Sequence, residues 1–133
     1  MAIVTGVVLA IAVGWFATAL RLDRDRAFYP TVMMVIAVLY ILFGLIGETT
    51  GAWLREAPFS AAFFALAAVG FRTSLWLLVV ALAAHGIFDL VHPSLIDNPG
   101  VPVFWPAFCS SYDIAAAIYL AWLLKSKRVP AEV

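Results

Sequence analysis

Charged side chains are scarce in this sequence. Asp, Glu, Lys and Arg make up 12% of its 133 residues, against about 25% in an ordinary soluble domain. Eight basic and eight acidic residues give a net charge of zero, and no basic patch is large enough to indicate a nucleic-acid partner. Cys109 is the single cysteine, which excludes an intrachain disulfide. The sequence also lacks a phosphate-binding glycine loop, a dinucleotide fingerprint and a CxxC motif.

Apolar residues make up most of the sequence. Hydrophobic residues make up 65% of the chain, and the mean hydropathy is +1.05. A soluble domain is only about 45–50% apolar. We therefore expect an all-α integral membrane protein in which residues 1–133 form a single transmembrane helical domain in contact with membrane lipids.

Turn residues and charges divide the apolar sequence into five predicted transmembrane helices, at about 2–20, 30–47, 52–71, 74–92 and 104–124. One helix over 57–92 would exceed about 50 Å, far more than the hydrocarbon thickness of about 30 Å. The break is expected at 70–74, where a glycine and an arginine precede two good N-cap residues. The residues after Arg128 are expected to fray.

Basic residues set the predicted orientation. With the N-terminus outside and five spans, the C-terminus is cytoplasmic and only Arg55 falls outside. Seven of the eight basic residues then lie on the cytoplasmic side, as the positive-inside rule requires: Arg21, Arg24, Arg26, Arg72, Lys125, Lys127 and Arg128. We accordingly expect a multipass protein of the bacterial cytoplasmic (inner) membrane.

Small residues four apart mark the first helix. Gly6, Ala10 and Gly14 form a small-xxx-small ridge that lets a second helix approach closely. The partner is either another helix of the chain or, in an oligomer, a second copy. A helix that simply contains small residues is the plainer interpretation.

The fourth predicted helix holds both histidines. His85, Asp89 and His92 lie at positions i, i+4 and i+7, which places them within about 60° of arc on one helical face. Ionisable groups are costly inside a membrane and usually mark a working site.

The topology brings further polar groups to the outer half of the membrane. At 1.5 Å of rise per residue, Asp113 should lie at the depth of His85, with Asp89 and Cys109 at a shallower level. We predict an outward-open polar pocket between the second, fourth and fifth helices. Glu56 is expected to be solvated at the interface. The predicted pocket residues are His85, Asp89, His92, Asp113, Cys109, Glu48 and Tyr112.

Simpler interpretations exist for each group. His85 and Asp113 can form one buried ion pair that holds two helices in register. His92 can be a helix-end residue favoured by the helix dipole, and Cys109 a small buried hydrophobe. These groups are concentrated in the outer halves of the fourth and fifth helices, and this concentration favours a functional site over isolated structural roles.

A divalent metal site is the first functional hypothesis. His85, Asp89, His92 and Asp113 are the candidate ligands for zinc or iron, which both accept imidazole and carboxylate. Positions i and i+7 are about 10 Å apart along one helix, so a compact site has to be shared with the fifth helix. Such a site would bind or act on a lipid-like or small hydrophobic molecule. The sequence leaves open whether the protein is an enzyme.

Two other functions fit the same residues. A His–Asp chain at depth suits a small proton-coupled transporter acting as a homo-oligomer. Short loops suit an accessory or structural subunit of a larger membrane complex.

The last third of the chain carries a recognisable arrangement. His85-x-x-x-Asp89-x-x-His92-Pro93 is followed by Asn98-Pro99-Gly100-Val101-Pro102, Trp105-Pro106-x-Phe108-Cys109 and Tyr112-Asp113. This run resembles a family of small uncharacterised bacterial multipass membrane proteins. The resemblance implies a multipass fold and brings no activity with it.

Overall fold

The computed structural model describes residues 1–47 and 51–132 and contains five helices in this part of the chain. They are α1 (Ala2–Leu20), α2 (Phe28–Ile46), α3 (Ala52–Arg72), α4 (Trp76–Leu95) and α5 (Trp105–Lys125). Each is long and apolar enough to cross a membrane. The protein is thus an all-α multipass membrane protein, as predicted. Glu48, a predicted pocket residue, lies outside the described residues.

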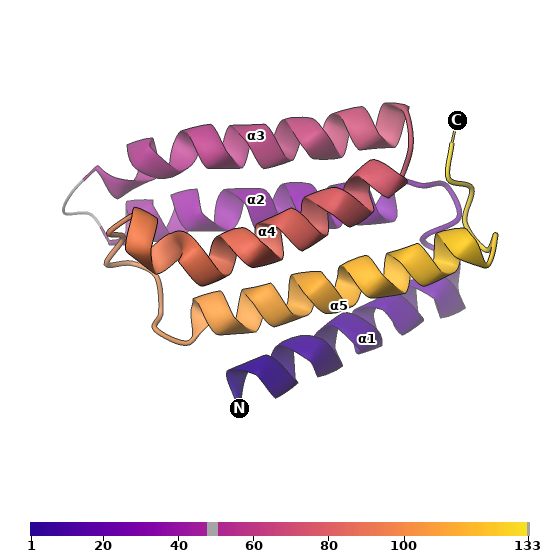
Figure 1. The fold of residues 1–133 in the computed structure, drawn as a ribbon, viewed down its shortest axis with the longest axis horizontal. Coiled ribbons are helices and arrows are strands. Elements are labelled where there is room, and N and C mark those ends of the chain that lie inside the picture. Colours follow the sequence, from indigo (N-terminus) through magenta and orange to yellow (C-terminus); the bar gives the residue numbers. More distant parts are fainter. Residues whose placement is uncertain (48–50, 133) are drawn as a thin grey trace.

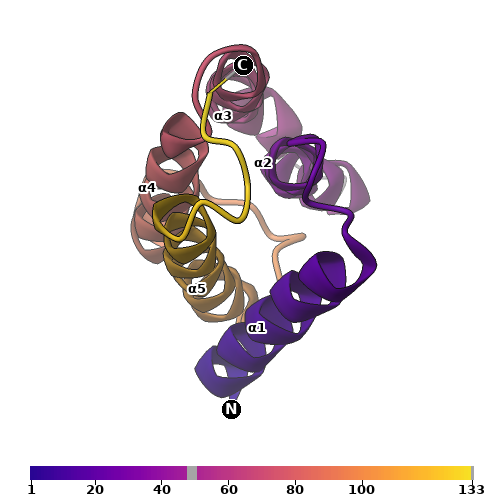
Figure 2. The ribbon, with the colours of Figure 1, turned by 90° about the vertical axis from the view of Figure 1, so that its right-hand side faces the viewer.

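The helices lie side by side, with the two termini at opposite ends of the bundle (Figure 1). Seen from one end they form a ring in the order α1, α5, α4, α3, α2 (Figure 2). Contacts join α1 to α5, α5 to α4, α4 to α3 and α3 to α2, and α2 also contacts α4 across the ring. The predicted adjacency of the last two helices, and that of α3 and α4 across their tight turn, is confirmed.

Large apolar side chains cover the outside of the bundle. Val80, Leu90 and Ile118 are each more than 60% exposed, as expected for surfaces that face lipid instead of water. The interior is built from small residues, leucines and a few polar groups. The ionisable groups inside are therefore the unusual feature of this fold.

Helix boundaries differ slightly from the predicted ones. The fourth helix was expected to end at His92 because Pro93 follows, yet α4 continues to Leu95. Proline lacks an N–H and crowds the carbonyl four residues earlier, but the helix tolerates it here in its last turn. At the other end α4 starts at Trp76, and the Leu75 N–H donates to Ala131 O at 2.8 Å. The contact comes from the C-terminal tail.

The expectation that the tail frays was wrong. Residues after α5 turn back beside the α3–α4 connection (Figure 1), where Ser74 and Glu132 form an isolated β-bridge. Val129 is buried at 2% exposure. An apolar side chain that finds a buried place offsets the entropy cost of ordering the segment.

The small-residue ridge of α1 is covered by α5. An added Cβ at Gly6 would overlap Ser111 Oγ and the Phe108 carbonyl, and one at Gly14 would lie 2.8 Å from a Tyr119 ring carbon. The small residues therefore let α1 and α5 of the same chain pack closely. The suggestion that this ridge joins two copies is wrong, because α5 already occupies it.

Candidate metal centre

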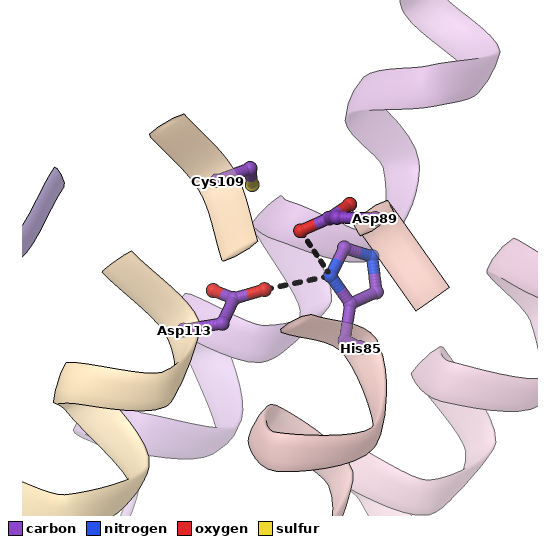
Figure 3. Close-up of side chains that lie close together, drawn as sticks. All are labelled: His85, Asp89, Cys109 and Asp113. Carbon is purple, nitrogen blue, oxygen red and sulfur yellow. Dashed lines mark hydrogen bonds and ion pairs between the residues drawn. The ribbon is translucent and has the colours of Figure 1, made fainter. Parts of the chain in front are cut away.

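Two helix-spaced pairs of side chains face each other at the centre of the site. His85 and Asp89 lie four residues apart on α4, and Cys109 and Asp113 lie four apart on α5, so each pair shares one face of its helix. Gly86 permits the close approach, because an added Cβ there would lie 3.0 Å from the Ser110 carbonyl oxygen. The four side chains point toward one another (Figure 3).

These four residues form a compact set that we call the quartet: His85, Asp89, Cys109 and Asp113. His85 Nδ1 lies 2.7 Å from Asp113 Oδ2 and 3.6 Å from Asp89 Oδ2. One potential ligand atom from each of the four residues can be chosen so that all lie within 4.8 Å of one another. None of the four side chains is more than 4% exposed. The predicted facing of His85 and Asp113 across two helices is confirmed.

The negative charge of the quartet is poorly balanced. Tyr40 OH donates a 2.8 Å hydrogen bond to Asp89 Oδ1, and one imidazole nitrogen faces both carboxylates. Asp89 Oδ2 and Asp113 Oδ1 are buried without a hydrogen-bond partner among the described residues. Buried charges are costly unless they are paired or coordinate a metal. The oxygens therefore fit ligands of a cation.

His92 belongs to a second polar set, together with Glu56 and Asn98. His92 Nε2 lies 2.8 Å from Glu56 Oε1, and the Asn98 side-chain amide donates to that same oxygen at 2.9 Å and to the Tyr40 carbonyl at 3.1 Å. The His92 ring stacks on Tyr40 with a centroid separation of 3.9 Å. Tyr40 thus links the two sets. The His92 imidazole contacts Glu56 and is not part of the quartet.

The expectation that Glu56 is solvated was wrong, because its side chain is 1% exposed. The signal in the sequence is the spacing of Ala52, Glu56 and Ser60, which places small residues on both sides of the acid on one helical face. Tyr40 and Asn98 were also missed as site residues. In the sequence Asn98 has the appearance of an ordinary turn residue. Its role was missed because only the folded loop brings it to Tyr40 of α2 and Glu56 of α3.

The predicted single outward-open pocket is divided in the structure. A cavity of about 320 Å³ at the loop end is lined by His92, Asp97 and Asn98 among others. The quartet itself is buried. Tyr112 is half-buried and lines a different, largely apolar cavity between α1, α2 and α5, which Cys109 also lines. Cys109 therefore lies between the other three residues of the quartet and this apolar cavity.

Replacing Tyr40 by phenylalanine tests the link between the two sets. Tyr40→Phe keeps the stacked ring but leaves Asp89 Oδ1 without its donor. A buried acceptor left unmet costs about 1–3 kcal/mol, so the free energy of unfolding in detergent should fall by that amount. Tyr112→Phe, at the wall of the apolar cavity, is the control and should have little effect. Equal stability of the Tyr40 variant and the unmodified protein would contradict the role given to this hydrogen bond.

Comparisons with protein-family models, with curated proteins and with solved structures found no match to this chain. The resemblance to small bacterial multipass proteins stays a prediction. Function therefore has to be argued from the geometry of the quartet and its surroundings.

Proposed function

We propose that this multipass membrane protein holds one divalent metal ion at His85, Asp89, Cys109 and Asp113. The ion is zinc or iron, and it binds or acts on a lipid-like or small hydrophobic molecule. One observation carries the proposal: a buried quartet in which two carboxylate oxygens have no hydrogen-bond partner among the described residues.

The donor set suits these metals. Imidazole nitrogen, carboxylate oxygen and thiolate sulfur are all zinc ligands, and iron also accepts them. Metal binding would replace the proton that His85 and Asp113 share across 2.7 Å. With all four residues bound, a tetrahedral site is closed; with three bound, one position is open to water or to a carbonyl oxygen. His92 is not among the proposed ligands, because its Nε2 lies 2.8 Å from Glu56 Oε1 and the residue is outside the quartet.

The surroundings support a lipid-like molecule. Cys109 lines the cavity between α1, α2 and α5 and also belongs to the quartet. A molecule entering from the bilayer would meet the metal centre through this shared wall.

The proposed setting is the bacterial cytoplasmic membrane, with the N-terminus outside and the C-terminus inside. Support comes from the seven basic residues that this orientation places on the cytoplasmic side. The quartet then lies in the outer half of the membrane.

Metal analysis of the protein purified in mild detergent without chelator tests the proposal. We expect about one equivalent of zinc or iron per chain, its loss on treatment with a strong chelator, and its return on adding zinc or iron(II). The proposal would be overturned if the protein is purified without metal and then binds neither zinc nor iron(II). That result would leave the quartet as a helix clamp in an accessory subunit or as a proton relay in a transporter.

A further inference from the structure

The cavity of about 320 Å³ at the loop end lies where α4 runs into the α4–α5 connection, and we call it the loop-end cavity. Its polar wall is made by His92, Asp97 and Asn98. Asp97 is exposed, whereas the His92 side chain is 2% exposed, so this wall leads from water to a buried imidazole. A water molecule takes up about 30 Å³. The cavity therefore has room for an ion together with part of its hydration shell.

The contacts of His92 determine which ring nitrogen is left for a ligand. Nε2 lies 2.8 Å from Glu56 Oε1, and a carboxylate oxygen accepts hydrogen bonds, so Nε2 carries the proton. In the neutral imidazole Nδ1 then holds the lone pair that can bind a metal. A histidine that ligates a metal almost always donates its other ring N–H to a carboxylate, a carbonyl or water. The His92–Glu56 pair has this arrangement.

The imidazole is also held in one orientation. Its ring stacks on Tyr40 at a centroid separation of 3.9 Å. The Asn98 amide donates to the same Glu56 oxygen that faces His92, at 2.9 Å, and the Glu56 side chain is 1% exposed. A carboxylate that is itself hydrogen-bonded is the usual support of a metal-binding histidine. The second polar set therefore orients His92 as well as joining α3 to α4.

The backbone that carries Asp97 is fixed by contacts on both sides. Arg55 Nη2 of α3 donates to the Asp97 carbonyl at 2.9 Å, and the next residue, Asn98, donates to the Tyr40 carbonyl of α2. Ile96, on the other side, is buried at 5% exposure. A ligand group on an ordered backbone loses less conformational freedom when it binds. The fold thus presents one carboxylate and one imidazole to the same cavity.

We propose that the loop-end cavity binds a second, hydrated divalent cation, zinc or iron(II), through His92 Nδ1 and the Asp97 carboxylate. Water completes the coordination shell, and Glu56 is the positioning residue for His92. This site is separate from the quartet and goes beyond the metal centre proposed above. It offers two protein ligands where the quartet offers four, so it binds zinc more weakly. Competition with a strong chelator therefore measures the quartet alone.

NMR of the two histidines tests the proposal, because His85 reports on the quartet and His92 on the loop-end cavity. Full-length protein with isotope-labelled histidine is titrated with zinc in detergent micelles, and His92→Gln identifies the His92 signals by their loss. Before zinc is added, His92 should be the tautomer with its proton on Nε2. Zinc should shift the His85 resonances first, and further zinc should shift the Nδ1 resonance of His92.

Matched variants separate this site from general attraction of zinc to acidic groups. Glu56→Gln should weaken zinc binding at His92 about 10–100-fold, the usual effect of losing a group that supports a ligand. Asp97→Asn removes a proposed ligand and should weaken it about tenfold or more, while the affinity of the quartet is unchanged. Asp25→Asn, at an exposed carboxylate between α1 and α2, is the control and should leave the His92 response intact.

Two results would overturn the second site: a His92 ring protonated on Nδ1 alone, or equal zinc responses at His92 in the Asp97 and Asp25 variants. The same titration separates the two proposals. A zinc response at His92 without one at His85 would support the loop-end site and refute the metal centre at the quartet. A response at His85 that is never followed by one at His92 would refute the loop-end site and leave the metal centre standing.

Discussion

Asp113→Asn is expected to lower the affinity for zinc by about 100-fold or more. Loss of a group that only supports a ligand already costs about 10–100-fold, and Asp113 supplies a ligand oxygen directly in the proposed centre. Its side chain is 0% exposed and lies 2.7 Å from His85 Nδ1. Asparagine keeps the shape while removing a buried charge, so the bundle should still fold. Competition titration against a chromophoric chelator measures the affinity.

Asp97→Asn is the matched control. Asp97 is an exposed carboxylate in the α4–α5 connection, and its loss should leave zinc affinity unchanged. Similar affinities for the Asp113 variant and the unmodified protein would show that zinc binds elsewhere. A second quartet variant, Cys109→Ser, should also weaken binding, because it replaces a thiolate by a poorer zinc ligand.

Gly100→Ala is expected to have the largest effect on stability. An added Cβ would overlap the Phe43 carbonyl oxygen of α2 and lie 2.7 Å from its carbonyl carbon. Backbone atoms cannot rotate away, so the loop has to shift. Asn98, whose Oδ1 accepts the Gly100 N–H, would then lose its bonds to Glu56 and to α2. Overpacking costs about 1–3 kcal/mol, and the lost hydrogen bonds add about 1 kcal/mol each.

Gly51→Asn provides the comparison for Gly100→Ala. Gly51 has φ of +62°, and an added Cβ there meets only Leu54 Cδ1 at 4.0 Å. Asparagine tolerates this left-handed conformation, so the cost should be small. Unfolding titrations in mixed micelles compare the two variants. A Gly100 variant as stable as the Gly51 variant would contradict the close contact between the loop and α2.

Much of the quartet was predictable from the sequence, because the information is local to two helices. Hydropathy and turn residues locate α4 and α5, and 1.5 Å of rise per residue places His85 and Asp113 at one depth. Helical spacing then brings Asp89 and Cys109 to the same faces. Adjacency of two helices joined by a short loop completes the prediction.

The second set was not predictable by the same reasoning, because it depends on contacts between segments far apart in sequence. Glu56 and His92 meet because α3 packs against α4, and Asn98 joins them only after the loop folds over the end of α2. Similarly, the sequence marks the ridge of Gly6 and Gly14 without naming α5 as its partner. Helix periodicity indicates which face is special but leaves the choice of neighbour to tertiary packing.

X-ray absorption spectroscopy of the zinc-loaded protein tests the central claim most directly. Zinc held by Cys109 with His85 and the two aspartates should show one sulfur at about 2.3 Å and nitrogen or oxygen neighbours at about 2.0–2.2 Å. The sulfur shell should disappear in Cys109→Ser while zinc remains bound. A first shell that contains no sulfur in the unmodified protein would contradict a metal centre built from this quartet.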